Sequence, residues 1–553
     1  MFKKIKISDR LKEKLKFFSI VVLISLFACI PYLGEGTIFA HDLSYHLSRI
    51  MNTAEEITNG NFPVFIHSNL LNGFGYGNPL FYPELFLYPA VVLFKLGMGI
   101  LFSYKILIIL ATIVTFLTSF YAANYISKDK KISWITSCLY TFSLYRLVDI
   151  YVRGALGEVL AFMFLPILLV GLYDVLYGEN KKWYLIPIAL FCLINSHLLS
   201  FIMAVILILI ICLVNIKKII KNKIILKKLA VAAIVSLLLS MSFVVPYFEQ
   251  TIDYDFNVEV HKNSAESLRD NAIDLKDVLG DEISSDGITV TKSIGILLIV
   301  LPVLMFFVKK DENEICYSFY KMIYAIGIVL LIVSTKLFPW INFECFGIIQ
   351  FPYRLNIITT LLFSFVAGYS VMKVFENKED AFKIIMILIF IISSKYIADV
   401  NVNPNSIDYE ILMSGTLIGN GEYMPLGFDS SDDDVYSIYD FKTKIDYKKE
   451  NSKLSFDYKK SDNEFKVHVP LTYYKGYKAY VIKDDVKTDD KIEVKRNELN
   501  SHLLLIGDSN IEGKIVVEYD MTIMQKIGYV ISIMTLVLFI NYIIYVEKIK
   551  IKE

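Results

Sequence analysis

Residues 103–126 read SYKILIILATIVTFLTSFYAANYI, and this stretch decides the fold class. A helix needs about 20 mainly apolar residues to cross the hydrocarbon core of a bilayer. The stretch is long enough to do so. The whole chain has the same character, because 55% of its 553 residues are hydrophobic and its mean hydropathy is +0.51. Soluble domains contain roughly 45 to 50% apolar residues, so the sequence predicts an integral membrane protein.

Eleven further stretches resemble this one, so the predicted fold is an α-helical polytopic membrane protein with about twelve transmembrane helices. The spans are 17–34, 103–126, 132–149, 157–177, 183–197, 198–216, 229–247, 291–308, 316–335, 354–375, 382–399 and 523–546. The first follows a lysine-rich start and has no small-residue cleavage site after it, so we interpret it as a retained span rather than a signal peptide.

One apolar run, 81–98, is ambiguous because it contains Pro83, Glu84, Pro89 and Lys95. Lysine and arginine accumulate in short cytoplasmic loops of membrane proteins. If this run does not cross the membrane, every lysine block of the chain falls on one side. We therefore predict a re-entrant or surface-lying helix here, with both termini in the cytoplasm.

The same topology predicts which segments lie outside: 35–102, 150–156, 248–290, 336–353 and 400–522. Segment 248–290 contains eleven acidic and three basic residues. A translocated loop is free of the positive bias of cytoplasmic loops. Charge and topology therefore agree.

Segment 400–522 is polar and has short alternating runs of apolar residues. The runs are FKVHV (465–469), AYVIK (479–483), KIEVK (491–495), HLLLIG (502–507) and KIVVEYD (514–520). Alternation with period two is typical of antiparallel strands with one buried face. We predict three parts: a transmembrane domain over 1–399, an extracytoplasmic β-sandwich over 400–522, and a last transmembrane helix with a short cytoplasmic tail over 523–553.

Composition also excludes some classes of function. The formal net charge is zero, so the chain has no overall electrostatic signature of nucleic-acid binding. The six cysteines lie in or beside apolar segments without a C-x-x-C pair, which indicates small buried side chains rather than metal ligands or disulfides.

The first outer loop carries the densest group of chemically versatile residues. His41, Asp42, His46 and Arg49 follow directly after a span, and on a helix positions 42, 46 and 49 share one face. Such a face at the lipid boundary could hold a base or bind a phosphate. An amphipathic helix with a solvated side would have the same pattern.

Further ionisable residues stand at the predicted membrane boundary. Arg153 and Glu158 are a plausible pair, because charges at membrane depth are costly unless they pair or line a polar cavity. His197 stands at the junction of two apolar runs, where a helix-end role is the simpler interpretation. Arg354 opens a span, where it could extend to the headgroups or bind a lipid phosphate through two nitrogens.

Several short motifs resemble, in order, a known group of bacterial membrane proteins. They are HDLSYHLSR, NGNFP, GFGYGNPLFYP, VRGALGE, NSHLLS, QFPYRL, NGEYMP (420–425) and TYYKGYKAY (472–480). Together they resemble the YfhO type, and especially the group labelled "6-pyruvoyl-tetrahydropterin synthase-related". The three-histidine zinc site of the soluble pterin enzyme is not evident in the sequence.

This resemblance implies a likeness to GT-C glycosyltransferases, which transfer a sugar from a polyprenyl-phosphate carrier to an acceptor outside the membrane. In those enzymes an acidic residue of the first outer loop acts as base or metal ligand, and Asp42 matches it. By the same resemblance, Arg153, Glu158 and Arg354 are candidates for contacts with the carrier phosphate and the acceptor. The further candidate substrate-binding residues are His41, His46, Arg49, His197, Glu422 and Tyr423. A divalent metal ion, Mg²⁺ or Mn²⁺, is a possible cofactor. Because the second outer loop has no clean D-x-D motif, the sequence does not decide whether the reaction depends on a metal.

The resulting prediction is a glycosyltransferase that modifies a cell-envelope polymer or glycan on the outer face of the cytoplasmic membrane. Its partners would be a polyprenyl-phosphate-linked sugar, the envelope acceptor and the lipid membrane, with no nucleic acid. Two alternatives stay open: a transporter or flippase for envelope precursors, and a non-catalytic assembly protein. Transporters usually show repeat symmetry and paired interrupted helices, neither of which is evident here.

Overall fold

A computed structural model describes residues 8–552 apart from short gaps at 39, 261–262, 285, 287, 310–314, 377, 379, 403–411, 413–416, 431–436, 441–442, 451 and 461–463. Residues 1–7 of the lysine-rich start and residues 310–314 of the lysine block at 309–314 lie outside the described residues, and the cytoplasmic location of both segments stays a prediction. The chain divides into two compact units. Unit 1 comprises 1–43, 101–236 and 263–407, and unit 2 comprises 44–100, 237–262 and 408–553.

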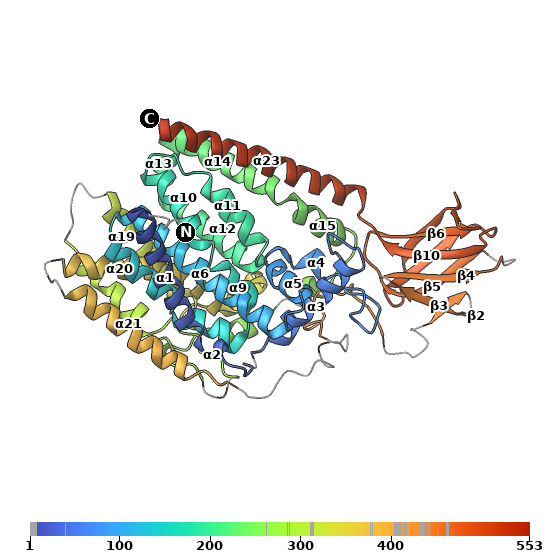
Figure 1. Ribbon diagram of the computed structural model, residues 1–553, viewed down its shortest axis with the longest axis horizontal. Coiled ribbons are helices and arrows are strands. Elements are labelled where there is room, and N and C mark those ends of the chain that lie inside the picture. Colours follow the sequence, from blue (N-terminus) through green and yellow to red (C-terminus); the bar gives the residue numbers. More distant parts are fainter. Residues whose placement is uncertain are drawn as a thin grey trace, which may run out of the picture. The chain divides into compact units, whose positions relative to one another are not determined.

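Unit 1 is helical (Figure 1). Its α-helices are α1 (Asp9–Ala28), α2 (Ile30–Leu33), α6 (Ile100–Ser127), α7 (Lys130–Thr141), α8 (Leu144–Val148), α9 (Leu156–Ala161), α10 (Leu165–Tyr177), α11 (Leu185–Ile194), α12 (Leu198–Val214), α13 (Ile216–Lys221), α14 (Lys223–Leu239), α17 (Ala265–Asn271), α18 (Ile296–Val300), α19 (Ile315–Val333), α20 (Asn356–Val374) and α21 (Ala381–Ala398). Between them lie the π-helix η2 (Asp149–Arg153) and the 3-10 helices η3 (Leu275–Asp277), η4 (Leu301–Phe307), η5 (Trp340–Asn342), η6 (Glu344–Ile349) and η7 (Pro352–Leu355).

Helix α20 forms the centre of unit 1. All of its residues from Asn356 to Met372 are buried, and it packs against α7, α19 and η4. Small residues permit this close packing: a Cβ at Gly368 would lie 2.2 Å from Thr136 Oγ1, and a Cβ at Gly327 would lie 2.4 Å from Phe363 Cε1. The core of unit 1 therefore depends on close contacts between neighbouring helix backbones.

Six helical stretches of the described residues are long and apolar enough to cross a membrane, and the broken pair α14 and α15 would add a seventh. The six are 100–127, 156–177, 315–333, 352–374, 381–398 and 523–547, and each matches a predicted span. The predicted count of about twelve is not confirmed. Several other predicted spans are divided or short: 132–149 contains a break and a π-helix, and 183–197 contains a helix of ten residues.

The ambiguous run 81–98 forms only short helices. The chain here contains α4 (Asn78–Phe81), η1 (Leu85–Leu87) and α5 (Tyr88–Lys95). An eight-residue helix is about 12 Å long at 1.5 Å per residue, which is too short to cross a bilayer. This agrees with the prediction that the run does not cross; the side of the membrane on which it lies stays a prediction.

Unit 2 combines helices with two antiparallel sheets. Its other helices are α3 (Leu43–Thr58), α15 (Met241–Thr251), α16 (Asn257–Val260) and α23 (Ile523–Lys552). Helices α15 and α23 pack side by side (Figure 1), and a Cβ at Gly528 would lie 2.7 Å from the Met241 carbonyl oxygen. The strands are β1 (Ile438–Asp440), β2 (Thr443–Ile445), β3 (Tyr447–Glu450), β4 (Lys453–Tyr458), β5 (Phe465–Thr472), β6 (Tyr477–Lys483), β7 (Val486–Lys487), β8 (Ile492–Arg496), β9 (His502–Gly507) and β10 (Gly513–Tyr519).

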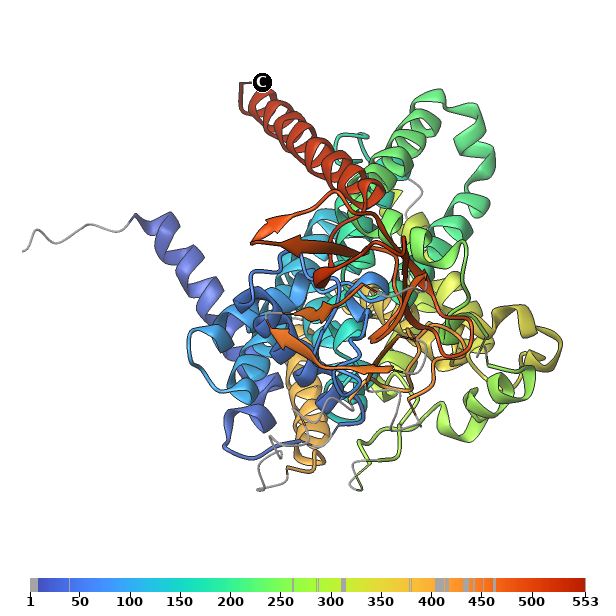
Figure 2. The ribbon, with the colours of Figure 1, turned by 90° about the vertical axis from the view of Figure 1, so that its right-hand side faces the viewer.

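The strands form two five-stranded sheets. They are drawn as orange to red arrows in Figures 1 and 2. Their orders are β2-β1-β5-β9-β8 and β3-β4-β10-β6-β7, and all pairings are antiparallel. Alternate apolar residues of both sheets are buried in one core, among them Val467, Val469 and Leu505 from one sheet and Phe456 and Ile515 from the other. The predicted β-rich domain is therefore present in the C-terminal part of the chain.

Candidate functional site

Asp42 lies in a turn that pairs with the end of η2 in unit 1. The backbone N–H of His41 donates to the Val152 carbonyl at 3.0 Å, and that of Asp42 donates to the Arg153 carbonyl at 2.9 Å. Helix α3 begins one residue later, at Leu43. The prediction that Asp42, His46 and Arg49 share one face of a helix is therefore wrong for Asp42, because this residue precedes the helix.

Gly154 permits this pairing. Its φ of +63° is in the left-handed region, and a Cβ there would lie 2.9 Å from the Ala40 Cβ and 3.1 Å from the Leu43 backbone nitrogen. Only glycine avoids both the conformational cost and the collision. The glycine of the VRGALGE motif thus holds the Asp42 turn against Arg153.

A buried charge cluster adjoins this turn. The π-helix η2 brings Arg153 Nη1 to 2.5 Å from Asp149 Oδ1. Arg153 Nη2 also donates to Glu158 Oε1 at 2.8 Å. The three residues are only 5%, 0% and 2% exposed, respectively. Two carboxylates and a guanidinium are therefore held together out of water, as charges at this depth require.

A second arginine completes the cluster from a distant part of the chain. Arg354, in η7, donates from Nε to Glu158 Oε1 at 2.8 Å, and its Nη1 donates to the side chain of Gln350. Among the described residues, Arg354 Nη2 has no hydrogen-bond partner, and the side chain is 12% exposed. Arg354 therefore keeps a donor available at the margin of the cluster.

Asp42 is the accessible carboxylate beside these buried charges. Its side chain reaches the surface, but protein atoms surround much of the carboxylate. This desolvation raises its pKa, and the positive charges of Arg153 and Arg354 offset only part of the rise. An accessible acid with a raised pKa next to two arginines is an arrangement suited to proton transfer near an anion.

The two predicted histidines of unit 1 have different positions. His41 Nε2 lies 2.9 Å from the Ile288 carbonyl oxygen at an exposed site. His197 caps α12, accepting from the Ser200 backbone N–H through Nδ1, and lies close enough to Glu158 to interact with its charge. The structure thus brings Asp42, Arg153, Glu158, His197 and Arg354 into one part of unit 1.

The remaining predicted residues lie in unit 2. Arg49 is buried, donates from Nη2 to the carbonyls of Tyr82 and Pro83 at 3.1 Å each, and stacks over the Tyr82 ring at 4.0 Å. Its Nε lies 3.4 Å from Glu84, and its Nη1 lies 3.3 Å from His46 Nδ1. These contacts tie α3 to the 82–84 segment, so they assign Arg49 a structural role in its unit.

Glu422 and Tyr423 belong to a loop of unit 2. The carboxylate of Glu422 accepts from the backbone and side chain of Asn420, at 3.1 and 3.3 Å. The Tyr423 ring stacks on Phe81 at 5.3 Å, and its carbonyl accepts from the Tyr474 hydroxyl at 2.9 Å. Both residues stabilise the loop that carries NGEYMP; their predicted contact with substrate stays a prediction.

Three members of the cluster were not among the predicted site residues: Asp149, Tyr145 and Gln350. Tyr145 donates its hydroxyl to Glu158 Oε2 at 2.8 Å, and Gln350 supports Arg354. Gln350 is the first residue of the QFPYRL motif, four residues before Arg354. This short spacing could have indicated that the two side chains interact. Tyr145 stands in an apolar stretch, where nothing in the local pattern distinguishes it from a packing residue.

The carboxylates of the cluster are engaged by arginines, and a divalent cation as cofactor stays a prediction. Asp149 and Glu158 already bind arginine nitrogens, and Glu158 accepts from both guanidiniums and from Tyr145. Across the described part of the chain, no group of three or more His, Cys, Asp and Glu side chains could hold a metal ion. Asp149 Oδ2 is buried without a hydrogen-bond partner among the described residues.

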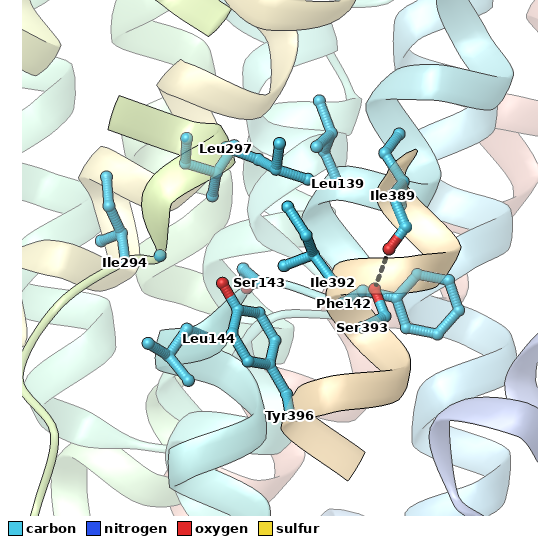
Figure 3. Close-up of a pocket in the computed structure, with 12 residues that line it drawn as sticks. Leu139, Phe142, Ser143, Leu144, Ile294, Leu297, Ile389, Ile392, Ser393 and Tyr396 are labelled. Carbon is cyan, nitrogen blue, oxygen red and sulfur yellow. Dashed lines mark hydrogen bonds between the residues drawn. The ribbon is translucent and has the colours of Figure 1, made fainter. Parts of the chain in front are cut away.

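Unit 1 also contains a small cavity apart from the cluster (Figure 3). It has a volume of about 20 Å³ and apolar walls that include Leu144, Ile294 and Ile392. Ser393 donates its hydroxyl to the Ile389 carbonyl at 2.7 Å, as the dashed line in Figure 3 marks. A single water needs roughly 10 to 15 Å³ by this measure, so the space is a packing void rather than a substrate site.

Comparisons with known proteins identify a family. No curated protein matches the chain. Among solved structures, the cryo-EM structure of arabinofuranosyltransferase AftD from mycobacteria is similar at 16% identity, with a TM-score of 0.40, over 76% of this chain and 28% of that chain. This chain therefore spans just over a quarter of the length of that protein.

The family described as Bacterial membrane protein YfhO matches residues 77–419, well over half of the chain. None of the matches supports the narrower resemblance to the pterin-synthase-related group. The long apolar helices agree with the family description. The chain therefore belongs to the family Bacterial membrane protein YfhO and is a multi-pass membrane protein.

Proposed function

We propose that this chain is a glycosyltransferase that moves a sugar from a polyprenyl phosphate to an acceptor glycan or polymer of the cell envelope. One observation carries the proposal: the accessible carboxylate of Asp42, with its raised pKa, lies beside a cluster of two arginines. A base and an anion-binding group next to each other are what this reaction requires.

In the proposed reaction, an acceptor hydroxyl attacks the anomeric carbon of the sugar from the face opposite the phosphate. The bond from that carbon to the phosphate oxygen breaks, and the phosphate keeps the electron pair. The hydroxyl proton moves to Asp42. One displacement of this kind inverts the configuration at the anomeric carbon. Because desolvation raises its pKa, Asp42 is a stronger base than an ordinary surface aspartate.

The two arginines have different proposed roles. Arg153 is bound to both Asp149 and Glu158, so it positions the cluster and contributes positive charge. Arg354 shares Glu158 with it but has Nη2 available, so it is the proposed donor to the departing phosphate. Hydrogen bonds from guanidinium to phosphate are strong and directional. The isoprenoid tail of the carrier would remain in the bilayer.

The test replaces Asp42 by Asn, which keeps the size of the side chain and removes its basicity. A strain that lacks the chain is complemented with wild type, Asp42→Asn or Asp380→Asn, and envelope glycans are compared by mass spectrometry. Asp380 is a matched control, because it is an exposed aspartate of unit 1 that pairs with Lys383. We expect Asp42→Asn, at wild-type abundance, to resemble the deletion, and Asp380→Asn to restore the glycan.

If Asp42→Asn restores the glycan fully, the proposed chemistry is wrong. A transporter or assembly protein would then be the better interpretation, because neither needs a base at this position. If the deletion leaves every envelope glycan unchanged, glycosyl transfer by this chain is contradicted as well.

A further inference from the structure

Unit 2 contains a cavity of about 230 Å³ that is distinct from the Asp42 cluster. It lies between the 60–68 loop that follows α3 and the sheet of β4, β6 and β10, with residues 519–521 completing the wall. A water needs roughly 10 to 15 Å³ by the same measure. The cavity is therefore large enough for a ligand of many atoms.

Its polar walls are acidic. Three carboxylates line it, from Glu56, Glu518 and Asp520, together with one lysine, Lys453. Glu56 is 3% exposed and accepts from Asn61 Nδ2 and Ser452 Oγ, both at 2.7 Å. These hydrogen bonds hold the carboxylate in the wall without a direct ion pair among the described residues.

The other two carboxylates are held by lysines. Glu518 Oε2 lies 2.5 Å from Lys453, and Asp520 Oδ2 lies 2.5 Å from Lys478. Each salt bridge engages one carboxylate oxygen, so oxygens on both groups stay available as hydrogen-bond acceptors. Lys526 also lies 3.3 Å from Asp520 Oδ2, so three lysines face the three carboxylates and the wall has no net charge that would attract an ionic ligand.

Aromatic side chains supply the rest of the lining. Tyr477 and Tyr519 lie edge to face at 5.4 Å, and Phe62 is 71% exposed despite its size. The Tyr477 hydroxyl makes no hydrogen bond within the described part of the chain. Apolar ring faces beside a few fixed polar groups are the usual composition of a small-molecule site.

We propose that this cavity binds a neutral sugar unit of the acceptor, an inference that rests on the proposed glycosyl transfer. The hydroxyl groups of a sugar can donate to the wall carboxylates and to Tyr477, and its C–H faces can pack on the aromatic rings. A neutral sugar also matches a wall whose carboxylates are balanced by lysines, whereas an anionic polymer gains no unpaired cation there. The site binds the acceptor and takes no part in the bond-breaking step.

A divalent cation is a poorer occupant. Two of the three carboxylates are committed to lysines, and no group of metal-binding side chains occurs in the described residues. The aromatic lining offers a cation such as Ca²⁺ no oxygen ligands beyond the tyrosine hydroxyls. The mixed walls therefore favour an uncharged ligand with several hydroxyl groups.

The experiment measures binding by saturation-transfer NMR on the full chain in detergent. The probes are two neutral trisaccharides, maltotriose and chitotriose, and one anionic oligomer of glycerol phosphate. We expect at least one trisaccharide to bind at concentrations up to roughly 10 mM, and the anionic oligomer not to bind. Binding of neither trisaccharide, or equal binding of the anionic oligomer, would overturn the proposal.

Two variants locate the binding. Phe62→Ala removes the exposed ring, and Glu518→Gln removes one wall carboxylate; each should weaken trisaccharide binding roughly ten-fold. Matched controls are Leu499→Ala, a large apolar residue 89% exposed, and Glu493→Gln, whose carboxylate pairs with Lys495 on the other sheet. Unchanged affinity in both cavity variants would place the binding elsewhere and contradict the proposal.

The Asp42→Asn variant shows whether the acceptor-binding inference and the proposed transfer reaction fail independently of each other. Asp42→Asn should bind the trisaccharide as wild type does, because Asp42 belongs to a different unit. If Asp42→Asn still transfers sugar, the proposed reaction fails while the binding measurement stands. If Asp42→Asn abolishes transfer and no neutral sugar binds the wild-type cavity, the reaction stands and the acceptor site fails.

Discussion

Replacing Gly154 by Ala should disable the site by moving Asp42, although neither the base nor the arginines change. The φ of Gly154 is +63°, and an L-residue in this region costs about 1 to 2 kcal/mol. The new Cβ would also lie 2.9 Å from the Ala40 Cβ and 3.1 Å from the Leu43 nitrogen. The 40–43 turn must therefore move, or the backbone around 154 must.

The magnitude follows from the contacts that hold the turn. Two backbone hydrogen bonds, from His41 to Val152 and from Asp42 to Arg153, fix it, and each contributes about 1 kcal/mol. Weakening both, together with the strain, gives a loss of about 2 to 4 kcal/mol in the stability of this contact. A misplacement of about 1 Å can cost roughly a hundred-fold in rate, so we expect the transfer rate to fall by about 10- to 100-fold.

The assay compares sugar transfer and thermal unfolding for three purified proteins: wild type, Gly154→Ala and Gly97→Ala. Gly97 is the matched control, because its φ is +88° and a Cβ there meets nothing within 4 Å. Both variants carry backbone strain, but only Gly154→Ala collides with the Asp42 turn. Wild-type transfer by Gly154→Ala, or an equal loss in Gly97→Ala, would refute the reasoning.

Two further predictions concern charge. Arg354→Lys keeps the positive charge but loses the planar guanidinium that contacts both Glu158 and Gln350. The KM for the lipid-linked donor should therefore rise roughly ten-fold in a transfer assay. An unchanged KM would contradict the proposed phosphate contact. Burial and the neighbouring His468 lower the pKa of His502 from 6.5 to about 4. Between these values the unfolded chain binds a proton that the folded chain does not, so the stability of the β-sandwich should fall by up to about 3 kcal/mol from pH 6.5 to 4. Thermal melts of wild type and His502→Asn check this, and an equally steep decline in His502→Asn would disprove it.

The sequence predicts the strands of the β-sandwich that have a clear alternation. β5, β6, β8, β9 and β10 all lie at the predicted runs, and all five contribute apolar side chains to the core between the sheets. Of the strands that were not predicted, β4 alternates over six residues and was missed, whereas β1, β2, β3 and β7 are short; β3 reads YKKE and is mainly exposed. A polar edge strand is specified by its pairing with β4 rather than by its own composition.

In the helical part, the predicted spans match the observed helices where a stretch is long and uniformly apolar. α6, α20 and α23 match predicted spans because their length alone suffices to cross a bilayer. The predicted span 132–149, in contrast, does not form one continuous helix. α7 ends at Thr141, α8 begins at Leu144, and Asp149 is already the first residue of the π-helix η2; hydropathy carries no information about these interruptions.

The candidate site was predictable only in part. Arg153 and Glu158 are five residues apart, so their pairing could be inferred from spacing. Arg354 joins Glu158 across 196 positions of the chain, which only tertiary packing determines. The grouping of His46 and Arg49 with Asp42 rested on a continuous helix, but α3 begins after Asp42.

The most direct test of the central claim is transfer of a radiolabelled sugar from polyprenyl phosphate by the purified full chain, with and without the Asp42→Asn substitution. Membrane fragments from the deletion strain supply the acceptor. Transfer by wild type and its loss in a folded Asp42→Asn protein is the result that this account predicts. Equal incorporation of label by the two proteins would contradict it.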